Sequence, residues 1–257
     1  MPVCKVIFRL DFKLHFGIID SPGKIFEIFW DTLNLGNRPN SQLSKSPVHR
    51  IISVQTRDGE RGPVASFNAS PSTFDGALEK IEGIELLNLL ETEPLLSLVR
   101  LAGRLCENFN IDIISRSGFR LIYLGKVGDS FQDALASFNG FFKPNYITSV
   151  EEKLGRISDV GIIWEGADES GVKYRCHSGP YRSQEAPRYF TSIIDKISTS
   201  SDFDTICDLD LYEQNFSISK RTISNLYRPI VLKANKFIKD LENGLIQNME
   251  KTHANRK

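Results

Sequence analysis

The sequence predicts an α+β protein with two similar lobes, each an antiparallel sheet covered by a long amphipathic helix. The first observation is segment 4–16, where apolar and polar residues alternate almost without exception. Successive side chains of a strand point to opposite faces, so this alternation is typical of a half-buried strand. The apolar residues expected to be buried are Val6, Phe8, Leu10, Phe12, Leu14 and Phe16. Charged residues interrupt the segment, so we expect a strand of the mature fold and not a signal peptide.

Two long amphipathic helices are the second observation. One is expected to begin after Thr92, with Pro94 in its first turn, and to run to Phe109. The other covers 223–245. In both, apolar residues recur at intervals of three and four, which gives each helix a continuous apolar stripe. Because each helix follows segments that resemble strands, each is expected to cover a sheet.

The rest of the first half shows shorter elements. The expected ones are a helix at 23–33, a loop at 34–47, and strands at 49–56, 63–69 and 111–124. Asp58-Gly59 predicts a hairpin turn between two of these strands. Residues 74–90 have helical spacing interrupted by Gly76 and Gly83, which predicts a short or broken helix. Gly118 predicts a bulge in the long strand.

The second half is expected to repeat this plan. A helix capped by Ser130 and a weaker helix at 148–156 precede strand segments. The expected strands are 158–165, 172–178 and 204–213, with one helical turn at 188–197. We place the N-terminal lobe at 1–145, the C-terminal lobe at 146–250 and a basic tail at 251–257.

Composition excludes several classes of protein. The 257 residues carry 32 Lys plus Arg and 32 Asp plus Glu, so no overall charge attracts nucleic acid or an anionic membrane. No apolar run approaches the ~20 residues that span a bilayer. The four cysteines are far apart and form no C-x-x-C pair, which argues against a zinc or redox motif. We expect reduced thiols and a bacterial-type cytoplasmic location.

The segment Ile114–Tyr123 carries a resemblance to a known family. It resembles the R-x-G-L-R-Y-[IV]-N strand of a sporadically distributed, uncharacterised bacterial protein family of about this length. Leu209-Asp210 resembles the L-D-x-D stretch of that family, and the order of elements agrees, although Leu121 stands where the family prefers Tyr. The resemblance implies no activity, because the family has none established.

Arg116 and Arg120 are the first candidate binding residues. They bracket Gly118 at an even spacing, so an unbulged strand directs both side chains to one face. Two guanidinium groups on one face can clamp a phosphate or carboxylate. The alternative is that each arginine pairs with an Asp or Glu across the sheet or points to solvent.

Asp208 and Asp210 also lie two residues apart, on the strand predicted at 204–213. Paired carboxylates can hold Mg²⁺ for phosphodiester chemistry. The alternative is a strand with a polar solvent face. A nuclease needs a further acidic ligand and usually a lysine at matched spacing, and the sequence shows neither.

The remaining motifs favour no enzyme class. The four histidines lack metal-binding spacing, and His177 is expected to point away from its neighbour Cys176. The sequence has no glycine-rich phosphate loop, nucleophile elbow or dinucleotide fingerprint. No catalytic residue, metal or cofactor is therefore predicted.

A basic helix face is the last candidate. Lys233, Lys236 and Lys239 recur at helical spacing, whereas 75–93 is strongly acidic. The two segments dock internally, or the lysines meet an acidic partner or nucleic acid, or they form an ordinary solvated face. We expect the lysines to be exposed.

These observations favour a non-enzymatic cytoplasmic interaction protein that binds a macromolecular partner or self-associates. We expect a protein partner or a second copy of the chain, and no membrane. The alternative is a nucleic-acid-acting protein, such as a metal-dependent nuclease of a defence or mobile-element system. A third carboxylate near Asp208 and Asp210 would favour the enzyme.

Overall fold

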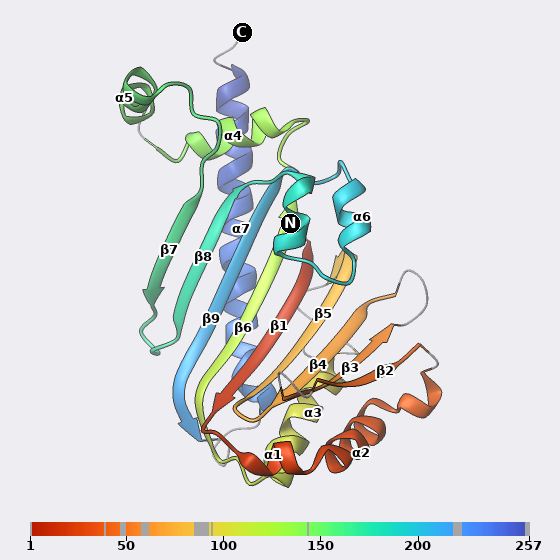
Figure 1. Ribbon diagram of the computed structural model, residues 1–257. Coiled ribbons are helices and arrows are strands. Elements are labelled where there is room, and N and C mark those ends of the chain that lie inside the picture. Colours follow the sequence, from red (N-terminus) through yellow and green to blue (C-terminus); the bar gives the residue numbers. More distant parts are fainter. Residues whose placement is uncertain are drawn as a thin grey trace.

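Nine strands form one continuous antiparallel sheet (Figure 1). The computed structural model describes residues 2–254 apart from 39, 47–49, 58–61, 85–92, 94, 143 and 218–222. The strands are β1 (Val3–Phe12), β2 (Gln42–Ser46), β3 (Ile51–Arg57), β4 (Val64–Ser70), β5 (Thr73–Ile84), β6 (Ile113–Gly125), β7 (Ile162–Ala167), β8 (Lys173–Pro180) and β9 (Thr205–Ser217). Their order in the sheet is β2-β3-β4-β5-β1-β6-β9-β8-β7.

Helices lie on both faces of this sheet. They are α1 (Phe16–Asp20), α2 (Pro22–Leu33), η1 (Leu35–Asn37), α3 (Leu95–Asn108), α4 (Phe131–Asn139), α5 (Pro144–Leu154), η3 (Ser183–Arg188), α6 (Ile194–Thr199) and α7 (Ile223–Ala254). The long helix α7 runs along one face, which α2 and α3 also cover, whereas η3 and α6 lie over one end of the other face (Figure 1). We call these the helix-covered face and the open face. In the described part of the chain, no helix has the length and apolar character needed to cross a membrane.

The α+β class is confirmed, and the sheet is not divided between the two halves of the chain. Strands β1 and β6 pair directly at its centre, with Val6 opposite Leu121 and Arg9 opposite Gly118. The expected picture of two separate sheets is therefore replaced by one sheet that crosses both halves. The two long helices predicted from sequence are present as α3 and α7.

Strand β1 has the predicted alternation but ends earlier than expected. The side chains of Val6, Phe8 and Leu10 are fully buried on the helix-covered face. Leu14 and Phe16 were predicted to be buried as well, but they are 58% and 61% exposed. The chain leaves the sheet after Phe12, where backbone N–H groups bond to the turn between β4 and β5, and α1 begins at Phe16.

The prediction of a helix at 74–90 is wrong for residues 74–84, which lie in β5 (Thr73–Ile84), and residues 85–90 lie outside the described residues. This strand pairs with β1 on one side and β4 on the other, so long-range pairing satisfies its backbone. Gly76, which suggested a broken helix, lies beneath the ring of Phe8. A Cβ at this position would lie 2.3 Å from the ring. Gly83 has a φ of +85°, a backbone conformation that favours glycine.

Smaller differences also have local causes. Strand β2 occupies part of the segment expected to be a loop, because it pairs with β3 along Gln42–Ser46. The helical turn expected at 188–197 is replaced by η3 and α6. The predicted turn at Asp58-Gly59 and the cap at Thr92 and Pro94 lie outside the described residues.

Candidate functional site

The candidate site lies on the open face of the sheet, where β6, β8 and β9 meet. The pairing of β6 with β1 shifts register near Asp11 and Phe12, and not at Gly118. The bulge predicted at Gly118 is therefore absent from the pairing. As a result, the side chains of Arg116 and Arg120 share one face.

Each arginine is paired with an aspartate of β9. The guanidinium of Arg120 donates two hydrogen bonds to the carboxylate of Asp208, at 2.7 and 2.6 Å. Arg116 donates to Asp210 at 2.8 Å, and its guanidinium carbon lies 4.6 Å from the centre of the Tyr212 ring. These contacts favour the structural interpretation of the arginines over the anion clamp, because both guanidinium groups already have carboxylate partners.

Asp208 and Asp210 lie on the open face, as their spacing predicts, and Leu209 between them is buried on the other face. Burial raises the pKa of Asp210, although Arg116 and Arg120 oppose the shift. The hydrogen bonds that Arg120 donates to the carboxylate of Asp208 raise the pKa of Arg120. Within the described residues, no group of three His, Cys, Asp or Glu side chains is arranged to hold a metal. The two aspartates thus act as partners for arginine in this geometry.

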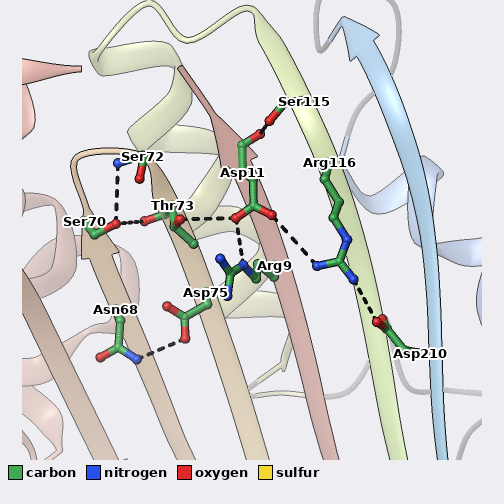
Figure 2. Close-up of polar contacts among 10 residues, drawn as sticks. All are labelled: Arg9, Asp11, Asn68, Ser70, Ser72, Thr73, Asp75, Ser115, Arg116 and Asp210. Atoms are coloured by element: carbon green, nitrogen blue, oxygen red, sulfur yellow. Dashed lines mark hydrogen bonds and ion pairs between the residues drawn. The ribbon is translucent and has the colours of Figure 1, made fainter. Parts of the chain in front are cut away.

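The ion pairs continue across the centre of the sheet (Figure 2). Asp11 lies between Arg9, whose Nε donates to it at 2.7 Å, and Arg116, whose Nη1 is 3.9 Å away. Asp11 also accepts a hydrogen bond from the hydroxyl of Thr73. The network therefore links β5, β1, β6 and β9 through side chains of the open face alone.

A groove of about 470 Å³ adjoins this network. Arg120, Asp208 and Asp210 line it from β6 and β9, and Arg175 and His177 line it from β8. Sequence reasoning did not select Arg175, although the alternation along 173–177 places it on the same face as His177. Arg175 bonds Glu165 of β7 at 3.0 Å, and both side chains are largely exposed. The groove thus has charged walls of both signs.

Cys176 points to the opposite face from His177, as predicted, so these two residues do not form a shared site. Its Sγ lies 3.4 Å from the Sγ of Cys207, within the buried core. All four cysteines are free thiols. No sequence pattern indicates this contact, because the two residues are brought together only by the pairing of β8 with β9.

A buried ion pair joins the open face to the segment that covers its end. Lys5 Nζ lies 2.7 Å from Glu79, and both side chains are almost fully buried. Glu79 also accepts hydrogen bonds from Thr191 and from the backbone N–H of Ser192. These contacts fix the segment between η3 and α6 on the sheet. No local sequence pattern indicates them, because Glu79 is more than one hundred residues from Thr191 and Ser192 in the chain.

The three lysines of the basic helix face are exposed on α7, on the side of the sheet opposite the groove. Lys233 bonds Asp168 and Ser170 of the turn between β7 and β8. The structure therefore does not bring Lys233, Lys236 and Lys239 together with Arg116 and Arg120.

Comparison with known proteins gives no family. No family model matches the sequence, and no curated protein matches it. Two solved structures align with almost the whole chain, but with low TM-scores. The di-domain ARO/CYC BexL from the BE-7585A biosynthetic pathway is 8% identical, with 96% of this chain and 98% of that chain covered and a TM-score of 0.23. The di-domain ARO/CYC StfQ from the steffimycin biosynthetic pathway is 11% identical, with 97% and 98% covered and a TM-score of 0.22. Similarity at this level assigns no function.

Proposed function

We propose that this protein is a non-enzymatic interaction protein, and that the open face of its sheet binds a macromolecular partner. The observation that carries the proposal is the groove lined by Arg120, Arg175, His177, Asp208 and Asp210. Ion pairs hold Arg120, Arg175, Asp208 and Asp210 in place before any partner arrives. A surface ordered in this way loses less side-chain entropy on binding.

The balance of charge favours a protein partner over nucleic acid. Arg116 and Arg120 each pair with a carboxylate, so this surface has no excess of cations for a phosphate backbone. Arg175 is more exposed, and its partner Glu165 is equally exposed. A protein partner with charged groups of both signs is complementary to this groove. Complementary charges align the two surfaces and disfavour other partners.

The nuclease alternative has less support. Its two candidate metal ligands, Asp208 and Asp210, are bonded to arginines. In the parts of the chain that the structure describes, no third acidic or histidine ligand completes a metal group with them. A catalytic Mg²⁺ would have to displace both arginine contacts.

We also propose that the chain contains two structural repeats, with their boundary between α3 and β6 and not at 145/146, where the sequence analysis placed the boundary of the lobes. Each half runs from a central strand through two helices and an antiparallel set of strands to a long helix. The order of strands is nearly symmetric about the junction of β1 and β6. The proposed repeats are 3–108 and 113–254, and the strand that resembles the uncharacterised bacterial family opens the second.

The test compares two charge reversals on opposite faces. Arg175→Glu changes the groove at an exposed position, and Arg228→Glu makes the same change at an exposed position of α7. Each variant and the wild-type protein are used as bait in extracts of the native host, with partners quantified by mass spectrometry. We expect a specific protein to be retained by wild type and by Arg228→Glu, and lost with Arg175→Glu. Retention that is equal for all three baits would rule out the open face as the binding surface.

Nucleic-acid binding and self-association are measured with the same proteins. At about 50 mM salt, we expect no retention of the wild-type protein on single- or double-stranded DNA or RNA. Retention that is lost when Lys233, Lys236 and Lys239 are replaced by Glu would instead support the nucleic-acid alternative. Light scattering during gel filtration reports self-association, which would make a second copy the partner.

A further inference from the structure

A second cavity, of about 210 Å³, lies on the helix-covered face between α7 and strands β7, β8 and β9. Its apolar walls are Trp164, Tyr174, Leu209, Leu211, Ala234 and Phe237. The rings of Trp164 and Phe237 meet edge to face with their centres 6.0 Å apart. An apolar cavity of about 150 Å³ is large enough for benzene, so this one has room for a larger aromatic ring.

The cavity has one polar end, formed by Lys233 and the turn between β7 and β8. Asp168 is held by this turn, since one carboxylate oxygen accepts hydrogen bonds from the backbone N–H groups of Ser170 and Val172 at 2.8 and 3.0 Å. Lys233 bonds the other oxygen. These contacts lower the pKa of Asp168 to about 2, so the carboxylate stays charged near neutral pH.

Lys233 and Asp168 differ in the hydrogen bonds that each can still form with a ligand. Both oxygens of Asp168 already accept hydrogen bonds. The ammonium of Lys233 has three N–H donors, of which two are directed to Asp168 and to the hydroxyl of Ser170 among the described residues. The third is available to an oxygen atom of a ligand in the cavity. The polar end therefore offers a ligand a charged hydrogen-bond donor, the ammonium of Lys233.

We propose that this cavity binds a small aromatic carboxylate. Its ring lies against Trp164, Tyr174 and Phe237, and one carboxylate oxygen accepts the third N–H of Lys233. An aromatic ligand ring can pack against the edge-to-face pair of Trp164 and Phe237. A charge-assisted hydrogen bond to Lys233 at one end then fixes the orientation of the ligand. This site is separate from the groove of the proposed function, which lies on the other face of the sheet.

The first measurement is calorimetric titration with 2-naphthoate. We expect a Kd on the order of 0.1 mM, a realistic affinity for so small a ligand. Naphthalen-2-ylmethylammonium has the same ring system and the opposite charge, and it should bind at least about tenfold more weakly. Equal affinity for the two probes, or no binding of 2-naphthoate, would overturn the proposal.

The second measurement locates the ligand. The chain has two tryptophans, Trp164 in the cavity wall and Trp30, which is 52% exposed on α2. In nitrogen-15 NMR spectra, the variant Trp30→Phe assigns their two indole N–H signals. We expect 2-naphthoate to shift the signal of Trp164 and to leave that of Trp30 unchanged. A shift confined to Trp30, or in neither signal, contradicts binding in this cavity.

Two substitutions test the roles of the lysine and of the cavity volume. Lys233→Met should weaken 2-naphthoate binding by about tenfold, whereas Lys251→Met, at an exposed lysine farther along α7, should leave it unchanged. Ala234→Leu should abolish binding by filling the cavity. The comparison of the two lysine variants tests the role of Lys233 in binding even if Ala234→Leu does not fold. Equal affinities of these two variants would overturn the role of Lys233.

Discussion

The two halves of the sheet are covered differently on the same face. In the first half, α2 and α3 pack over the strands, and the rings of Phe8, Phe29, Phe67 and Phe74 form one aromatic cluster with centres about 6 Å apart. In the second half, α7 covers β7, β8 and β9, and a cavity remains beneath it. The two halves therefore differ in which helices cover them and in how tightly the aromatic rings beneath those helices are clustered.

The helices α2 and α5 explain this difference. Both precede outer strands of their half, but α2 buries Ile25, Ile28, Phe29 and Leu33. In contrast, none of the described side chains of α5 is buried, and Tyr146 and Leu154 are 61% and 84% exposed. Similar positions in the chain therefore do not produce similar packing. A helix adds to the core only when its apolar side chains reach the sheet.

The largest expected effect is on the aromatic cluster. Phe67 is fully buried, and its ring contacts those of Phe8, Phe29 and Phe74. Phe67→Ala should lower the free energy of unfolding by about 3–5 kcal/mol, because it removes buried surface and leaves a cavity. Urea denaturation followed by circular dichroism measures this change. A loss below about 1 kcal/mol would contradict close packing of the first half.

Overpacking the same half should have a smaller effect. A methyl group added at Gly76 would lie 2.3 Å from the ring of Phe8, which is itself fully buried. Gly76→Ala should therefore destabilise the protein by about 1–3 kcal/mol. Gly171→Ala is not a suitable control, since φ is +83° there, but Gly23→Ala meets no atom within 4 Å and should be tolerated. Similar denaturation midpoints for Gly76→Ala and wild type would show that the cluster can shift.

Truncating a phenylalanine in the second half should lower the free energy of unfolding by less than Phe67→Ala does. Phe237 is half-buried and already borders the cavity beneath α7. Phe237→Ala should lower the free energy of unfolding by about 1–2 kcal/mol, because less surface is withdrawn from the core than at Phe67. The same urea experiment compares the two variants directly. Equal losses at Phe67 and Phe237 would remove the contrast between the halves.

Local patterns predicted the elements whose own residues determine them. The alternation in β1 and the apolar stripes of α3 and α7 were sufficient, because these elements bury one face along most of their length. The same reasoning failed for β5. The spacing of its apolar residues predicted a helix, but its backbone pairs with β1 and β4 in the sheet. It also extended β1 to Phe16, since the sequence does not show where a strand leaves its sheet.

The candidate site was predictable only in part, for a related reason. Even spacing correctly placed Arg116 and Arg120 on one face, and Asp208 and Asp210 likewise. Which arginine meets which aspartate depends on the register of β6 against β9, and no local pattern encodes it. The buried pair of Lys5 and Glu79 and the contact of Cys176 with Cys207 depend in the same way on distant segments.

Two aspartates of the open face, Asp75 on β5 and Asp208 on β9, have different hydrogen-bond partners. In the second half, Asp208 is bonded to an arginine, whereas in the first half Asp75 accepts a hydrogen bond from the neutral amide of Asn68 at 3.1 Å. Burial raises the pKa of Asp75 above its ordinary value of 3.8, and the Asn68 hydrogen bond and Arg9 only partly oppose this shift. Folding therefore disfavours the charged form of Asp75.

The smallest expected effect follows from this raised pKa and depends on pH. Because the folded protein holds the Asp75 proton more tightly than the unfolded chain, the associated stability is present below pH 3.8 and is lost as pH rises through the raised pKa. Asp75→Asn keeps an acceptor for Asn68 and removes the titration. Relative to wild type, its free energy of unfolding should therefore increase as pH rises above about 4 and then level off. Urea denaturation between pH 3.5 and 7 measures this difference, with Asp240→Asn at an exposed position of α7 as the control. A difference that decreases with pH would mean that the open face favours the charged form of Asp75, as an arginine partner would.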